Sequence, residues 1–430
     1  MCISLNLKMY KKTVLDNGLK IISHKMSDRQ SASLGIWINV GGRYEPKEIK
    51  GISHYLEHLL FKGSKKYSCR EIKEHIEGVG GSLNAFTSEE TTCYLVKAPS
   101  RYLELSLDIL SDMVLNPALP HEEVEKEKTV ILEELKMYRD QPQSYVYELL
   151  DELLWPAQPL GEAIIGTVES VSGINKDKLH AFKDKYYTAS NIVVSVAGSV
   201  DHEKLAKKVE KIFSRRKKED INTFSKARQE QAKPQLKVFH KETEQTHMAL
   251  GFHGLRRDHP LRYALGVLNI ILGGNMSSRL FNEVREKRGL AYEIGSQVKR
   301  YHDTGAFIVH AGIDNRKVLE AVSLILEELN SAKEKLVTQD EFKRAKEFYL
   351  GQLMLALEDT MEHMLWIGES TAALNKTYSI QDVLKLVNKV KREDVLKVAS
   401  EIFQENKLNL SLIGPLKEEK AKISGQLHIN

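Results

Sequence analysis

The sequence predicts an α+β protein built from two homologous domains, each an antiparallel-rich sheet with helices packed on it. Segments with strand and helix patterns alternate along the chain, but without the regular strand–helix–strand period of a parallel α/β fold. One strongly polar stretch, residues 214–235, separates two parts of similar length. These two parts resemble each other at one constant offset, which indicates an internal duplication.

The offset between the two parts is 216 residues in three separate segments. Residues 191–198 match residues 407–414, and the apolar positions of the helices before them match in the same way. Residues 34–36 match residues 250–252 at the same offset. Three segments with one offset are hard to attribute to chance, so each half is expected to form one domain. The expected parts are an N-terminal domain over 1–213, a connection over 214–235 and a C-terminal domain over 236–430.

Local signals define the elements of the first domain in chain order. Asp16-Asn17-Gly18 lies between two apolar runs and predicts a tight hairpin. Ser68 and Glu71 form a capping box that starts a helix. The other expected elements are a strand over Leu34–Val40, a helix over Ser53–Lys62, strands over Ser82–Thr87 and Thr91–Ala98, and helices over Ser100–Leu115 and His121–Arg139.

The composition is that of an ordinary globular protein. Of its residues, 42% are hydrophobic and 28% are charged, and 63 Lys and Arg against 59 Asp and Glu leave a net charge of +4. This balance argues against nucleic acid as a partner. No apolar run approaches the ~18 residues that a membrane span needs. The three scattered cysteines fit a reducing compartment. We therefore expect a cytoplasmic protein without membrane or nucleic-acid partners.

The residues that carry chemistry begin with His54-Tyr55-Leu56-Glu57-His58. On a helix, His54 and His58 stand one turn apart on the same face, so two imidazoles can bind one zinc ion. Glu57 is adjacent on that face and can act as a general base toward water. The alternative is a solvated helical face with two ordinary histidines.

A third zinc ligand is expected from the long helix His121–Arg139. Glu127 and Glu134 fall on its apolar stripe beside Ile131, and a carboxylate among apolar neighbours needs a partner or a metal. The two carboxylates are two turns apart, ~10.5 Å along the axis, so both cannot bind one ion. The alternative interpretation is that these carboxylates only form one face of a charged surface helix.

This pattern resembles the pitrilysin/insulinase family of inverted-zincin metallopeptidases, in the style of the mitochondrial processing peptidase-like proteins and their bacterial counterparts. His54–His58 is followed by Glu134, 76 residues after His58. The similarity runs roughly from Lys11 to Pro415. Further matching segments are Gly81–Thr87, Leu160-Gly161, Ile165–Thr167 and Arg285–Tyr292.

The resemblance implies a role for each matching residue. His54, His58 and Glu134 would be the ligands of one Zn²⁺ per chain, and Glu57 would be the catalytic base. Glu127 would orient a ligand histidine. Two further sets complete the site: Asn84, Ala85 and Phe86 match an edge strand that pairs with the substrate backbone, and Arg285 and Tyr292 match a pair that reaches the substrate.

The family also implies an overall arrangement and an activity. The two domains are expected to form a clamshell chamber, and a chain of this length resembles members that work as dimers, either homodimers or pairs with a homologous chain. The expected function is a zinc metallo-endopeptidase that cleaves peptides or short unfolded segments. The alternatives are a non-catalytic subunit of a processing-peptidase-like complex and a protein that binds peptides without cutting them.

The second half has no counterpart of the metal pentad. The helix after its matching strand contains Ala264–Leu272, without histidine or glutamate. We therefore expect this half to form a wall of the chamber rather than a second metal site.

Overall fold

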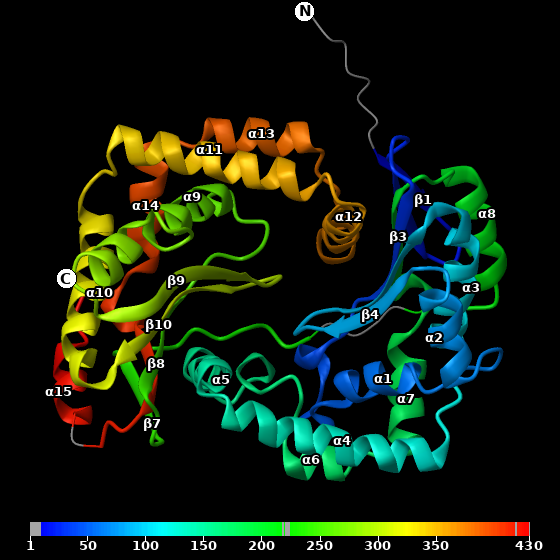
Figure 1. Cartoon of the computed structure of the whole chain (residues 1–430), viewed down its shortest axis with the longest axis horizontal. Coiled ribbons are helices and arrows are strands. Elements are labelled where there is room, and N and C mark those ends of the chain that lie inside the picture. The colour runs from blue at the N-terminus through cyan, green and yellow to red at the C-terminus, as the bar shows by residue number, and fades with distance from the viewer. Residues whose placement is uncertain (1–9, 217–218, 220–223, 418, 430) are drawn as a thin grey trace, which may run out of the picture. The chain divides into compact units, whose positions relative to one another are not determined.

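The computed structural model describes residues 10–216, 219, 224–417 and 419–429, which form two compact units. Each unit contains one sheet with helices packed on it (Figure 1). The α+β fold with two sheet-containing domains is therefore confirmed. The first unit comprises Met1–Leu135, Ala163–Ser225 and Met354–Gln381, and the second comprises Lys136–Glu162, Lys226–Leu353 and Asp382–Asn430.

The first unit contains a six-stranded sheet in the order β1-β2-β6-β3-β5-β4. All neighbouring strands are antiparallel except β2 and β6, which are parallel. The expected hairpin is present, with Val14 opposite Lys20 and Gly18 at φ 86° in the turn, a conformation that glycine adopts without strain. The strands are β1 (Tyr10–Val14), β2 (Lys20–Lys25), β3 (Ser31–Ile38), β4 (Ser82–Thr87), β5 (Thr92–Pro99) and β6 (Ile192–Gly198).

Helices cover both faces of this sheet. Because successive strand residues point to opposite faces, Leu34 and Ile36 of β3 enter the core formed with α1, α3 and α7. Trp37 enters a second apolar cluster with Met364 and Ile367 of α12. The helices of this unit are α1 (Ile52–Leu60), α2 (Cys69–Glu77), α3 (Leu103–Leu115), most of α4 (His121–Asp140), α6 (Val168–Ser172), α7 (Lys176–Tyr186), α8 (His202–Phe213) and α12 (Thr360–Leu374), with short helices η1 (Gly42–Tyr44), η2 (Lys47–Ile49), η3 (Ser100–Tyr102) and η5 (Ala189–Asn191).

The second unit contains a five-stranded sheet in the order β7-β11-β8-β10-β9, in which β7 and β11 are parallel. Its strands are β7 (Gln235–His240), β8 (Gln245–His253), β9 (Ala291–Arg300), β10 (Gly305–Asp314) and β11 (Asn409–Gly414). Its helices are α5 (Pro142–Leu154), α9 (Arg262–Leu272), α10 (Val318–Glu334), most of α11 (Gln339–Ala356), most of α13 (Ile380–Lys389), α14 (Arg392–Ile402) and α15 (Lys420–Gln426), with short helices η4 (Pro159–Gly161), η6 (Phe281–Glu286), η7 (Asn315–Lys317) and η8 (Glu405–Lys407).

The two sheets correspond strand by strand, as a duplication requires. The order β2-β6-β3-β5-β4 in the first unit is repeated as β7-β11-β8-β10-β9 in the second. Helix α7 at Lys176–Tyr186 and helix α14 at Arg392–Ile402 are separated by the same 216 residues that the sequence matches give.

Two helices are exchanged between the halves of the chain. Helix α5 belongs to the N-terminal half, but its Val146 and Leu150 pack on the sheet of the second unit. Helix α12 belongs to the C-terminal half and packs on the sheet of the first unit. The compact units therefore differ from the expected division into 1–213 and 236–430, because each of these helices buries its apolar face on the other sheet.

The expected connection 214–235 lies between α8 and β7. Its residues 217–218 and 220–223 are outside the described residues, and Gln235 is already the first residue of β7. Arg43 of the first unit contacts the carbonyl oxygen of Ser225, and the side chain of Gln158 in the second unit exchanges hydrogen bonds with the backbone of Arg228. In the part of the chain that the structure describes, no helix has the length and apolar character needed to cross a membrane.

Candidate metal centre

Helix α1 places His54 and His58 one turn apart on the same side. The helix begins after Gly51, whose φ of 96° and close approach to the backbone of Ile165 leave no room for a side chain. The buried carboxylate of Glu45 accepts hydrogen bonds from the backbone N–H groups of Gly51 at 2.8 Å and of Ser53 at 2.7 Å. A negative charge at this position satisfies free N–H groups and complements the helix dipole. It therefore fixes the start of the helix that carries both histidines.

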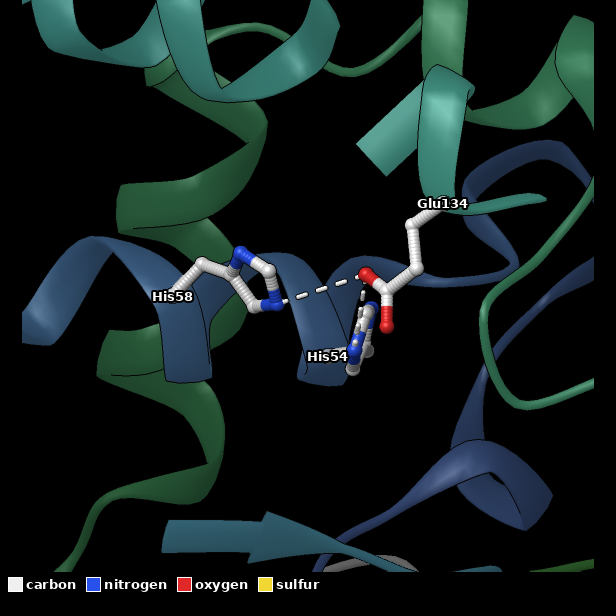
Figure 2. Close-up of side chains that lie close together, drawn as sticks. All are labelled: His54, His58 and Glu134. Carbon is white, nitrogen blue, oxygen red and sulfur yellow. Dashed lines mark ion pairs between the residues drawn. The ribbon is translucent and has the colours of Figure 1, made fainter. Parts of the chain in front are cut away.

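Helix α4 brings Glu134 to the same place. The Tyr55 hydroxyl of α1 donates a hydrogen bond to the backbone oxygen of Val124, which ties the two helices together. The Oε2 atom of Glu134 lies 3.6 Å from Nε2 of His58 and 3.8 Å from Nε2 of His54 (Figure 2). One candidate ligand atom from each residue lies within 4.8 Å of the other two. The structure therefore brings the three expected ligand residues together.

These donors fit a zinc ion. Two imidazole nitrogens and one carboxylate oxygen are a donor set of catalytic zinc sites, which keep the fourth position open. Metal–ligand distances of about 2.0–2.1 Å in a tetrahedron place neighbouring ligand atoms roughly 3.4 Å apart. The observed 3.6 and 3.8 Å differ from this by only a few tenths of an ångström. Among the described residues, no hydrogen-bond partner reaches Oε2 of Glu134 or Nδ1 of His54, although both atoms are buried. An unpartnered buried oxygen facing two imidazoles is what a metal would satisfy.

The charges at the centre also suit a bound cation. Burial, and secondarily the neighbouring His58, lower the pKa of His54 to about 4. A neutral imidazole keeps the lone pair that a metal ligand needs. Burial likewise raises the pKa of Glu134, which shows that the surroundings alone do not stabilise its negative charge.

Glu127 lies behind His58 rather than among the ligand atoms. Its Oε2 is 3.1 Å from Nδ1 of His58, and its Oε1 forms an ion pair with Nζ of Lys62. Burial would raise the pKa of Glu127, but the hydrogen bonds from Lys62 and His58 outweigh burial and lower it. An ionised Glu127 accepts the Nδ1–H of His58, which leaves Nε2 of that ring as the atom facing Glu134.

Glu57 points to the end of strand β4. The Thr87 hydroxyl donates a hydrogen bond of 2.6 Å to Oε2 of Glu57. Burial raises the pKa of Glu57, although this hydrogen bond and the nearby His58 act in the opposite direction. A carboxylate with a raised pKa and one oxygen held in place can accept a proton from water near the ligand atoms.

Comparisons with known proteins identify the family of this chain. The family description "Insulinase (Peptidase family M16)" matches residues 20–168, and "Peptidase M16 inactive domain" matches residues 173–349. The chain belongs to the insulinase (M16) family of peptidases. A Bacillus subtilis protein named as an uncharacterized zinc protease is 38% identical over 408 residues, which cover 95% of this chain and 98% of the relative. A Streptomyces coelicolor protein of the same description is 37% identical over 417 residues, covering 96% and 91%.

Solved structures show the same fold. A crystal structure described as a protease from Helicobacter pylori superposes with a TM-score of 0.88 at 25% identity, covering 94% of this chain and 99% of that chain. A Pseudomonas fluorescens structure described as a peptidase M16 inactive domain superposes with a TM-score of 0.87, covering 96% and 98%. At 19% identity, this second likeness concerns the fold alone.

The predicted substrate strand of this M16 chain is an edge strand. Asn84, Ala85 and Phe86 lie on β4, which ends the sheet order and has β5 as its neighbour. The backbone N–H of Ala85 donates to Oδ1 of Asn84 at 2.8 Å. The ring of Phe86 packs edge-on against Trp37. The outer edge of such a strand can accept an added strand.

Arg285 and Tyr292 lie in the second unit, separate in sequence and domain from the metal ligands. Arg285 belongs to the short helix η6, and Tyr292 is the second residue of β9. The Arg285 guanidinium lies 4.7 Å from the ring centre of Phe281 and 5.6 Å from that of Tyr292. Tyr292 is 75% exposed, so its side chain is accessible from solvent.

Two M16 site residues were missed in the sequence. Lys62 lies four residues after His58, so helical spacing could have placed it near Glu127. Thr87 ends a correctly predicted strand, but nothing in the sequence indicates that this strand end meets Glu57. That contact depends on how α1 packs against β4.

Proposed function

We propose that this protein is a zinc metallo-endopeptidase. The observation that carries the proposal is the convergence of His54, His58 and Glu134. The Oε2 atom of Glu134 is buried, faces both imidazoles and has no hydrogen-bond partner among the described residues. When bound there, Zn²⁺ would supply a Lewis acid for the scissile carbonyl and the attacking water. The relatives named as zinc proteases support this chemistry.

The chain's own residues would then divide the remaining work. Glu57 would take the proton from the attacking water and return it to the leaving amine. Its Oε2 is held by Thr87, so Oε1 is the oxygen left for proton transfer. Glu127 would keep His58 in the orientation in which Nε2 is the ligand atom.

The substrate would be a peptide or a short unfolded segment. It would add to the outer edge of β4 at Asn84–Phe86, so backbone hydrogen bonds would bind it with little dependence on sequence. Arg285 and Tyr292, from this chain or from a second copy, would donate hydrogen bonds to the oxygen on which negative charge develops. The chain would work in the cytoplasm as a processing-peptidase-like homodimer or as a pair with a homologous chain.

Zinc content and peptide cleavage, measured on the same preparation, test this function. We expect about one zinc per chain and cleavage of an internally quenched unstructured peptide. Glu57→Gln should lower turnover by at least ~10²-fold, because general-base catalysis contributes ~10²–10⁴-fold, while zinc content stays at the wild-type level.

The same measurements separate the alternative functions. Full zinc occupancy without cleavage would favour a protein that binds peptides without cutting them. A chain that binds no zinc would favour a non-catalytic subunit of a larger complex. A Glu57→Gln protein that folds but purifies without zinc would contradict the role given to Glu57.

A further inference from the structure

Two candidate ligand histidines and a lysine form a line along α1 and the turn after it. His54, His58 and Lys62 recur every four residues, so they lie along one side of α1 and the turn that follows it. Lys62 lies in the turn that follows α1, where its N–H donates to the carbonyl oxygen of Leu59 at 3.0 Å. Facing this line, α4 presents Glu127 and Glu134 seven residues apart.

Each oxygen of Glu127 has its own partner from α1. Oε2 is 3.1 Å from Nδ1 of His58, and Oε1 forms the ion pair with Nζ of Lys62. The Glu127 side chain is 4% exposed and the Lys62 side chain 23% exposed. A carboxylate so far from water depends on these partners for both its charge and its orientation.

We propose that Lys62 is a positioning residue for the metal centre. It would act through Glu127, by holding that carboxylate with Oε2 toward Nδ1 of His58. The hydrogen bond then fixes the ring of His58 with Nε2 directed to the metal position. The inference rests on the proposed zinc function, which it deepens by adding a residue that touches neither metal nor substrate.

A direct electrostatic effect of Lys62 on zinc affinity would have the opposite sign to the positioning effect. Lys62 is a cation near a cation site, so removing its charge should strengthen metal binding if simple repulsion dominated. Positioning through Glu127 predicts weaker binding instead, because partners of ligand histidines contribute roughly 10- to 100-fold to metal affinity. The direction of the change therefore distinguishes the two effects.

The test is zinc affinity of the full chain, measured by competition with a chromogenic chelator. We expect Lys62→Met to weaken zinc binding by about 10-fold or more. Lys62→Arg should restore most of it, since a guanidinium can also donate to Oε1. Lys66→Met is the matched control, because Lys66 pairs with Asp108 on the surface and has no contact with Glu127.

A double-mutant cycle shows whether Lys62 acts through Glu127. In a Glu127→Gln background, Lys62→Met should have little further effect on zinc affinity. Equal effects of Lys62→Met in both backgrounds would overturn the inference. An unchanged or tighter zinc affinity together with a lower melting temperature of the metal-free protein would also overturn it, and would leave Lys62 as a structural ion pair.

Two further results separate this inference from the proposed function. A wild-type chain that binds no zinc would refute the zinc function itself. Wild-type zinc binding with normal affinity in Lys62→Met would refute only the role of Lys62. If Lys62→Met is too unstable to measure, Lys62→Gln keeps an N–H donor without the charge and should still weaken zinc binding.

Discussion

Thr87 offers a direct test of how the candidate base is held. Thr87→Val keeps the β-branched shape that suits strand β4 but removes the hydroxyl that donates to Oε2 of Glu57 at 2.6 Å. The backbone of β4, including the edge at Asn84–Phe86, is left unchanged. The substitution therefore isolates one hydrogen bond.

The size of the effect follows from the type of bond. A hydrogen bond to a charged group contributes about 1.5–3 kcal/mol, and about 1.36 kcal/mol corresponds to a factor of ten. Part of this energy stabilises the ground state and the transition state equally and does not change kcat. Only the part that orients Glu57 for proton transfer affects turnover. We expect kcat to fall by about 10-fold, with KM and zinc content unchanged.

The assay compares three variants with the wild type in peptide cleavage and zinc content. Thr87→Ser retains a hydroxyl and should recover most of kcat. Thr92→Val is the matched control, because Thr92 lies opposite Thr87 on β5 and donates to the backbone oxygen of Val40 instead. A Thr87→Val enzyme with wild-type kcat, measured where Glu57→Gln is inactive, would refute the positioning argument.

The remaining predictions concern the ligands, the second unit and acid stability. Glu134→Ala should abolish zinc binding measured by metal analysis, whereas Glu133→Ala, one residue away on the exposed side of α4, should retain it. Tyr292→Phe should lower kcat/KM by roughly one to three powers of ten without changing zinc content or melting temperature; unchanged turnover would show that its hydroxyl has no catalytic role. Burial and the stacked His24 lower the pKa of His363 in α12 from 6.5 to about 4. The stability that depends on the neutral form of this residue should therefore be complete above about pH 6.5, and it should be lost as the pH falls toward 4. The melting temperature should therefore fall more between pH 7 and pH 5 in the wild type than in His363→Leu. An equal fall in both proteins would contradict this.

Most elements of the first domain could be predicted because their signals are local. The capping box at Ser68 and Glu71 starts α2, and both of its hydrogen bonds are present. The strand expected over Ser82–Thr87 has those bounds in the structure. Turn and cap residues act through the conformation of their own few neighbours, so distant parts of the chain do not alter them.

The exchange of α5 and α12 could not be predicted in this way. An amphipathic helix shows which of its faces is buried, but not which sheet buries it. Leu150 of α5 packs over Gly251, and Met364 of α12 packs over Gly35, where a side chain would occupy the space of each. Neither glycine is distinctive in the sequence, because its role depends on a helix more than 90 residues away.

The candidate site was predictable to the extent that it follows helix geometry. Spacing alone placed His54 and His58 together and separated Glu127 from Glu134, and the structure has Glu127 at Nδ1 of His58 instead of at the ligand atoms. The catalytic roles of these residues remain predictions. The contact between Thr87 and Glu57 joins a strand to a helix 30 residues away, so no local pattern marks it.

The second unit shows why the fold can persist where the metal centre does not. Helix α9 follows β8 as α1 follows β3, and its buried residues extend from Tyr263 to Leu272, but it contains no histidine, aspartate or glutamate. A core depends on many apolar side chains, and each can be replaced by another of similar volume at modest cost. A metal centre depends on three donor atoms at fixed positions, so losing one abolishes it without affecting the packing. Any contribution of this unit to catalysis must therefore come from exposed groups such as Tyr292, and not from a second metal ion bound at the corresponding helix.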